Sequence, residues 1–559
     1  MLPSQTKPCR DPCSLDRSSG AYKLCNKVTE IVSFESLHYC TELFLGFYVT
    51  SPSTASHSLG KRYAFKVMTN LVSVAIGVLT VGLVPRALGA ARFGDYSFLT
   101  NFFSQFMAFL DLRTSTFFYI RQSQSPHDKK LVTFYIHYIG LIVLVFFAST
   151  ALLTFSPLRN WLLPGQVSQY IFMGAVISLL LWSLDMMAGA MDAHGLTIDL
   201  EKTRMGNKIV SMILLLLLFH CQHLTFATYF LYQCFALIPI IAWLIFRLTR
   251  EGEYWNNLPR RVSKEDTQEY TRAFIHYSTP LAGYLVLTVL TATFDRWLLQ
   301  TQAGSIEQGL YSFAYGLMGV GYIFLNAIQP LMVREMSIAA AQLDFARMKH
   351  LYQRFFPPLF AVTAYFCAFL FVEADNLIVL FGGSEYSRSA LSFRVLTLFP
   401  MLTVIAGLNA AFVYATQRTR WFLILSSIFT PLGSALLYLL IAHHLLNLGA
   451  LGLSLKIIVL NGISVVILTR LITRILDLSF WKLMGHFLFV TGYLMVACAC
   501  HLYMQQWIKA PLPHFLVSGL IYTAIMALLI WISPRIFGLN HSQIEEITAL
   551  VSKRKASSP

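Results

Sequence analysis

Charged side chains stand inside stretches of this sequence that are otherwise almost wholly apolar. Asp111 and Arg113 interrupt one such stretch, Asp185 a second, Arg394 a third and Lys456 a fourth. A charge at the centre of a bilayer costs at least about 2.5 kcal/mol, so membrane proteins usually keep it in a bundle interior or a water-filled cavity. The chemistry that this pattern predicts is the binding and passage of a polar, charged molecule.

Uncharged polar residues accompany these charges at helical spacing. Tyr284, Thr288, Thr291 and Asp295 are separated by steps of 4, 3 and 4 residues, which places them on one helix face. Polar residues also hold membrane helices together without touching a substrate, and this alternative stays open for each of them. The predicted substrate-binding residues are Arg86, Asn101, Asp111, Arg113, Asp185, Tyr284, Asp295, Tyr322, Asn326, Gln329 and Arg394.

The sequence lacks the patterns of an enzyme or a metalloprotein. Its nine cysteines form neither a disulfide framework nor a metal-ligand spacing, and His220 and His223 stand in a tight hairpin. The longest connections expected outside the membrane, near residues 156–168 and 373–389, are too short for a catalytic domain. We expect no enzymatic activity, no metal and no cofactor.

Composition sets the fold class. Apolar residues make up 56% of the chain and charged residues 12%, whereas a soluble protein has about 25% charged residues. Apolar runs of about 20 residues recur between residues 64 and 532, as in transmembrane helices. We predict an all-α polytopic membrane protein with about fourteen spans, or thirteen or fewer if the fifth and sixth runs are one element.

The positive charge predicts orientation and not a nucleic-acid partner. The formal net charge is +15, and Lys and Arg collect in alternate connections, as the positive-inside rule expects for cytoplasmic loops. Both termini are therefore predicted to be cytoplasmic. Arg86 stands near the opposite interface, and Asp95, which opens an apolar run, is expected to be an N-cap.

One sequence pattern occurs twice. Residues 89–98 and 304–313 both read G-x4-G-x-Y-S-F, 215 positions apart, and each lies between two membrane-length runs. This predicts two six-helix lobes related by an internal repeat, with a polar cleft between them and Asp111 facing Asn326. The predicted organisation is an extension (1–62), an N-lobe (63–246), a cytoplasmic linker (247–272), a C-lobe (273–472), two further spans (473–534) and a basic cytoplasmic tail (535–559).

Two short motifs resemble a known family. Arg86-Ala-Leu88-Gly89, followed by Phe93-Gly94-Asp95-Tyr96, resembles the R-x-L-G and (F/Y)-G-x-Y signature of the polysaccharide and O-antigen flippases. Leu380-Phe381-Gly382 with Tyr386 resembles that family's L-F-G-x-x-Y segment. The family belongs with multidrug exporters and lipid II flippases in one superfamily.

The resemblance implies a function. It implies translocation of an undecaprenyl-diphosphate-linked oligosaccharide across the bacterial inner membrane by alternating access of the lobes. Arg86, Arg113 and Arg394 would then be candidate contacts of the diphosphate. Expected partners are this substrate and membrane lipids, with the polysaccharide polymerase and chain-length machinery as candidates. A cation-coupled drug or metabolite exporter and a lipid II flippase remain alternatives, and buried charges argue against a structural scaffold.

Overall fold

The computed structural model describes residues 59–250, 255, 258–259, 262–319, 323–416, 418 and 420–532. Nearly all of the predicted N-terminal extension and the whole predicted tail lie outside these residues. Within the described part the regular elements are all helices, and eleven of them are long and apolar enough to cross a membrane. Since kinks divide α3 and α10 into separate spans, the number of passes is about fourteen, as predicted.

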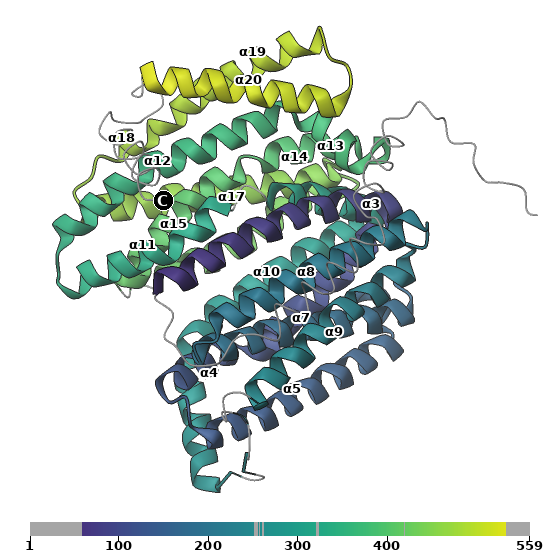
Figure 1. Cartoon of the computed structure of the whole chain (residues 1–559), viewed down its shortest axis with the longest axis vertical. Helices are drawn as coiled ribbons and strands as arrows, with labels where there is room; N and C mark the ends of the chain where they lie inside the picture. Colours follow the sequence, from purple (N-terminus) through teal and green to yellow (C-terminus); the bar gives the residue numbers. More distant parts are fainter. Residues whose placement is uncertain are drawn as a thin grey trace, which may run out of the picture. The chain divides into compact units, whose positions relative to one another are not determined.

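The helices form two successive sets along the chain, one for each lobe (Figure 1). The N-lobe consists of α3 (Leu59–Asp111), α4 (Thr114–Gln124), α5 (Lys129–Phe155), α6 (Leu158–Leu162), α7 (Ser168–Ala193), α8 (Thr197–His220) and α9 (Phe226–Arg250). The C-lobe consists of α10 (Lys264–Met318), α11 (Ile323–Ala341), α12 (Phe345–Val372), α13 (Ala374–Gly382), the 3-10 turn η2 (Ser384–Tyr386), α14 (Ser389–Leu396), α15 (Phe399–Ala415), α16 (Arg420–Ile441) and α17 (Gly449–Ile475).

Backbone geometry confirms the internal repeat. Gly89 kinks α3 with φ 76° and ψ 163°, and Gly304 kinks α10 with φ 82° and ψ 179°. Such positive φ angles are readily available only to glycine, which explains why the repeated motif begins with this residue. The caps repeat as well, because Asp128 and Asp344 accept hydrogen bonds from the backbone amides of Leu131 and Arg347 at the starts of α5 and α12.

The connection between the lobes is shorter than the predicted linker of residues 247–272. Helix α9 continues to Arg250, and α10 already begins at Lys264. The first turns of α10 pack on the N-lobe, where Tyr270 donates a hydrogen bond to Asp128 at 3.0 Å. Lys130 lies 2.9 Å from Asp266, and this hydrogen bond lowers the pKa of Asp266. The residues at the start of α10 favour a helix there, and these contacts hold its first turns on the N-lobe. Part of the predicted linker is therefore helical.

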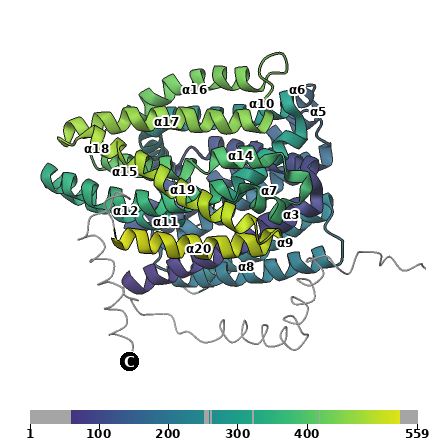
Figure 2. The same ribbon diagram turned by 90° about the horizontal axis from the view of Figure 1, so that it is seen from above.

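The two extra spans pack on the C-lobe. They comprise α18 (Phe480–Met484), α19 (His486–Gln505) and α20 (Pro511–Ile532), and Figures 1 and 2 show α19 and α20 in yellow beside α12. Tyr493, Cys500 and Tyr522 of these helices are buried in one apolar core with α12, α15 and α17. The extra spans are therefore part of the C-lobe packing.

Candidate functional site

The lobes meet most closely where the repeated glycines cross. A Cβ atom built on Gly94 would lie 1.8 Å from the carbonyl oxygen of Ser305, and one on Gly309 would lie 2.0 Å from that of Ala90. Neither distance is possible for a real side chain, so both positions require glycine. Each glycine thus packs against the backbone of the other repeat, and the helices approach as closely as two backbones can.

The two sequence motifs behind the family resemblance contact each other in space. Arg86 donates hydrogen bonds to the carbonyl oxygens of Val379 and Leu380 at 2.9 and 2.6 Å, at the C-terminal end of α13. The backbone amide of Ala90, just after the kink of α3, donates to Glu385 at 2.6 Å. We call these residues, together with Gly94 and Gly309, the interlobe latch: Arg86, Ala90, Gly94, Gly309, Val379, Leu380 and Glu385.

Asp95 joins the lobes and is not an N-cap, which corrects the sequence-based expectation. The helix segment begins at Ala90, five residues earlier, and Glu385 accepts its first amide hydrogen bond. Asp95 instead accepts hydrogen bonds from the Ser305 hydroxyl at 2.6 Å and from the Gln166 amide at 2.7 Å. The expectation was wrong because the kink at Gly89 moves the start of the helix.

Asp111 marks a break between α3 and α4. The next two residues, Leu112 and Arg113, have positive φ angles of 45° and 64°. The Asp111 carboxylate, in a residue only 6% exposed, accepts hydrogen bonds from the backbone amide of Ser115 at 3.2 Å and from its hydroxyl at 2.8 Å. Asp111 therefore binds the first turn of α4, whose N-cap position is Arg113.

Arg113 faces aromatic residues of the other lobe. Its side chain is exposed and forms no hydrogen bond or ion pair with residues that the structure describes. It lies close enough to Tyr414 of α15 to act electrostatically on the phenol, as does Tyr284 of α10. The Phe422 ring lies 5.5 Å from that of Tyr414 and 5.9 Å from that of Tyr284. The Arg113 guanidinium, unpaired among the described residues, thus lies within electrostatic range of an aromatic cluster of the C-lobe.

Two residues on the polar face of α10, Thr291 and Asp295, contact other helices of the C-lobe. Thr291 contacts Thr430 of α16 at 3.0 Å between the hydroxyl oxygens. Asp295 forms an ion pair with Lys456 of α17 at 2.6 Å, and both side chains are nearly buried. Helical periodicity identified this face correctly, but the neighbours that it meets are α16 and α17.

Two other predicted substrate-binding residues, Arg394 and Asp185, lie close to oppositely charged side chains. Arg394 donates to Asp375 at 2.5 Å. Asp185 is 83% exposed at its side chain and lies 4.0 Å from Arg204, which also approaches the buried Glu201 at 3.6 Å. Arg204 belongs to α8, whereas Asp185 belongs to α7, so no local sequence pattern links the two residues. The helical spacing of Arg204 from Glu201 was the signal that it belongs to α8.

The remaining predicted residues give less information. The side-chain oxygen of Asn101 is buried and has no hydrogen-bond partner among the described residues. Tyr322 lies outside the described residues, and of Asn326 and Gln329 only their place in α11 is described. The predicted juxtaposition of Asp111 with Asn326 therefore stays a prediction.

The structure also brings together a group of potential metal ligands that the sequence did not predict. Glu373, His501 and His514 bring their ligand atoms within 4.8 Å of one another. They come from the start of α13, the end of α19 and the start of α20, so no short sequence motif contains all three.

Comparisons with known proteins agree with this architecture. Residues 59–333 match the family described as polysaccharide biosynthesis protein. The structure is similar to that titled "Lipid II flippase MurJ, inward closed conformation", with a TM-score of 0.61, 13% identity, and coverage of 84% of this chain and 98% of that one. It is also similar to an inward-facing multidrug resistance MATE family transporter of the MOP superfamily, with a TM-score of 0.57, 13% identity, and coverage of 73% and 94%. No curated protein sequence matches the chain.

These findings confirm the resemblance that the two motifs indicated. At 13% identity the solved structures establish the fold alone, whereas the family match concerns the sequence of residues 59–333. The chain is thus a multi-pass helical membrane protein whose fold is similar to those of the MurJ and MATE structures, and it resembles the polysaccharide biosynthesis proteins over the whole N-lobe and the start of the C-lobe.

Proposed function

We propose that this protein translocates an undecaprenyl-diphosphate-linked oligosaccharide across the bacterial inner membrane during surface polysaccharide synthesis. The observation that carries the proposal is the match of residues 59–333 to polysaccharide biosynthesis proteins on a two-lobed transporter fold. The alternate basic loops support an orientation with both termini in the cytoplasm. Translocation of the head group is the step that this architecture suits, because a diphosphate and sugars cannot cross hydrocarbon unaided.

The geometry supports Arg113 as the contact of the diphosphate. Of the three arginines implied by the resemblance, Arg86 donates to α13 and Arg394 to Asp375. Arg113 keeps its donors available, and a guanidinium binds phosphate oxygens in bidentate fashion. Tyr414, which lies within electrostatic range of Arg113, and its neighbour Tyr284 offer aromatic faces on which sugar rings can stack. Arg86 and Arg394 then have a structural role beside the substrate path.

Alternating access gives the interlobe latch its role. The latch joins segments expected at the extracytoplasmic ends of their spans, and the glycine crossing leaves no room for a sugar. Release of the substrate on that side requires the latch to separate while the lobes rock. Any coupling ion would act on the equilibrium between the joined and the separated states of the interlobe latch.

The test is a gene deletion complemented with variants. Deletion should remove long-chain surface polysaccharide from gels and leave lipid-linked repeat units on the cytoplasmic side. Arg113→Ala should restore at least about 10-fold less polysaccharide than the wild type, since a charged hydrogen bond is worth about 1.5–3 kcal/mol. Arg113→Lys should restore an intermediate amount, because an ammonium cannot form the bidentate contact.

Controls separate this function from its alternatives. Arg272→Ala removes an exposed arginine of α10 and should restore polysaccharide fully. Unchanged polysaccharide with new sensitivity to cationic drugs would favour the exporter. Lysis with accumulated lipid II would favour a lipid II flippase. Either result would overturn the proposal.

A further inference from the structure

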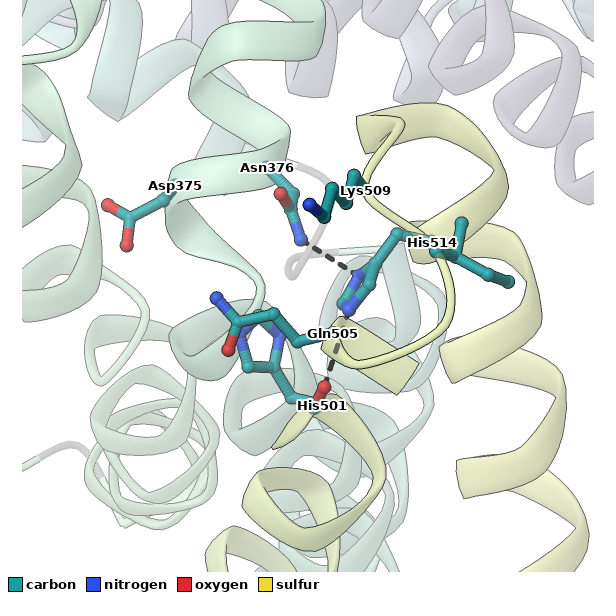
Figure 3. A pocket seen from close by; sticks show the side chains of 7 residues that line it. Asp375, Asn376, His501, Gln505, Lys509 and His514 are labelled. Carbon is teal, nitrogen blue, oxygen red and sulfur yellow. Dashed lines mark hydrogen bonds between the residues drawn. The ribbon is translucent and has the colours of Figure 1, made fainter. Parts of the chain in front are cut away.

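Three side chains with metal-binding atoms converge where the two extra spans meet the C-lobe. Glu373 stands between α12 and α13, His501 near the end of α19, and His514 in the first turn of α20. The Nδ1 atom of His501 lies 2.9 Å from Glu373 Oε1, and the Nδ1 atom of His514 lies 3.3 Å from Glu373 Oε2. Figure 3 shows His514 between Asn376 and the backbone of His501, with dashed lines to both.

These separations suit ligands of one small cation. Zinc binds histidine nitrogen and carboxylate oxygen at about 2.0–2.2 Å, so two ligand atoms of a tetrahedral site lie roughly 3.3 Å apart. Glu373 is fully buried and His514 is 3% exposed. Ligands buried to this degree are held rigidly, and a buried carboxylate needs positive charge or hydrogen bonds around it.

Neighbouring groups orient the ligands. The Nε2 atom of His514 lies 3.4 Å from the backbone carbonyl oxygen of His501 (dashed in Figure 3), which assigns the ring proton to Nε2 and makes Nδ1 the acceptor of the ring. Ser518 donates to Glu373 Oε1 at 2.7 Å, and Asn376 donates to Oε2 at 2.7 Å.

One amide group holds two of the ligand atoms next to each other. The two N–H groups of the Asn376 side chain donate to Glu373 Oε2 at 2.7 Å and to His514 Nδ1 at 2.9 Å. The two acceptor atoms therefore lie 3.3 Å apart. A cation that displaces this amide could be bound by both atoms.

There is room for the rest of a coordination shell. A cavity of about 370 Å³ opens beside the ligands and is also lined by Gln505, Asp375 and Lys509. Of the charged residues that line it, Asp375 is paired with Arg394. Water from this cavity can supply the fourth ligand.

We propose that Glu373, His501 and His514 bind a divalent transition metal ion, with zinc the best match, and that this ion fastens α19 and α20 to the C-lobe. Nitrogen and oxygen ligands in this number are those of tetrahedral zinc sites with one open position. The bound ion ties together segments that are 128 residues apart in the chain. The inference stands independently of the proposed transport function.

The metal content of the full-length protein tests the site. The protein is purified in detergent, stripped with a chelator, reloaded with zinc and analysed by elemental mass spectrometry. The wild type should retain about one zinc per chain, and His501→Ala and His514→Ala should lose most of it. His443→Ala, which removes an exposed histidine of the C-lobe, is the matched control and should retain it.

Two further measurements keep the test decisive if a variant folds poorly. His501→Cys preserves a zinc ligand, so it should keep the metal, and with cobalt it should show a thiolate-to-metal absorption band. Chelation should lower the melting temperature of the wild type reversibly and leave that of His501→Ala unchanged. A wild type that retains no zinc after reloading, or a His443→Ala variant that loses as much as His514→Ala, would overturn the proposal.

Discussion

Gly94 and Gly309 occupy equivalent positions of the two repeats and pack against each other's helix. A side chain on either would collide with a backbone carbonyl oxygen of the opposite repeat, at 1.8 Å for Gly94 and 2.0 Å for Gly309. A contact that is the same in both directions is what a two-fold relation between the repeats produces. The repeated glycine spacing in the sequence is therefore a packing requirement of the interlobe axis.

Gly94→Ala should prevent this close approach. Overpacking in a fitted core costs about 1–3 kcal/mol, and a clash with rigid backbone belongs at the upper end. We expect a melting temperature several degrees lower and at least about 10-fold less complementation of polysaccharide synthesis. Gly140→Ala is the control, because nothing lies within 4 Å of a Cβ atom there. Equal behaviour of the two variants would contradict the packing account.

Arg86→Ala should weaken the interlobe latch without disturbing either lobe. The substitution removes hydrogen bonds from α3 to two carbonyl oxygens of α13. Because Arg86 is exposed, we expect a modest cost of about 1 kcal/mol, enough to shift a balanced equilibrium between lobe arrangements severalfold. Spin labels on the exposed residues Leu158 and Leu446, one in each lobe, should report a larger population of long distances.

The matched control for the latch is Arg388→Ala. Arg388 is also exposed and pairs with Glu307 at 2.6 Å, but both residues belong to the C-lobe. Its removal should leave the distance distribution between the labels unchanged. The same shift in both variants would show that Arg86 does not act as a link between lobes.

Asp295→Asn should destabilise the C-lobe strongly, and a second substitution should restore it. Asp295 and Lys456 form a nearly buried pair at 2.6 Å, and removing one partner of such a pair costs about 3–5 kcal/mol. Asp295→Asn with Lys456→Met leaves no buried charge and should recover most of the melting temperature. If the double variant remains as unstable as the single one, the pair is not the origin of the effect.

Asp111→Asn should retain transport, whereas Asp111→Ala should lose stability. Asparagine caps helices about as well as aspartate, and Asp111 accepts the amide hydrogen bond of Ser115 at the start of α4. We expect Asp111→Ala to lower stability by about 1–2 kcal/mol, measured by thermal denaturation in detergent. Loss of transport in a stable Asp111→Asn variant would indicate a charge-dependent role, as an ion-coupled exporter requires.

The sequence predicted the fold better than the site. Long apolar runs and repeated glycines are local features, so they predicted the spans and the repeat, whereas the kinks at Gly89 and Gly304 became known from the structure. Helical spacing also identified the polar face that ends at Asp295. It could not show that this face meets α17, because Lys456 lies 161 residues further along the chain.

Tertiary contacts likewise decided the roles of the other charged residues. Arg86 and Arg113 are both arginines near helix breaks, and only the position of α13 shows that the first is engaged. Asp95 resembles an N-cap in the sequence, but the kink moves the helix start to Ala90. The cluster around Glu373 has no local pattern at all.

The most direct measurement of the account is flipping by the purified protein. The full-length chain is reconstituted in liposomes with a fluorescent undecaprenyl-diphosphate oligosaccharide, and an impermeant glycosidase reports which leaflet holds the sugar. The account predicts rapid exposure of sugar from the inner leaflet with the wild type and at least about 10-fold slower exposure with Arg113→Ala. No exposure above that of protein-free liposomes, or equal rates for the two proteins, would contradict it.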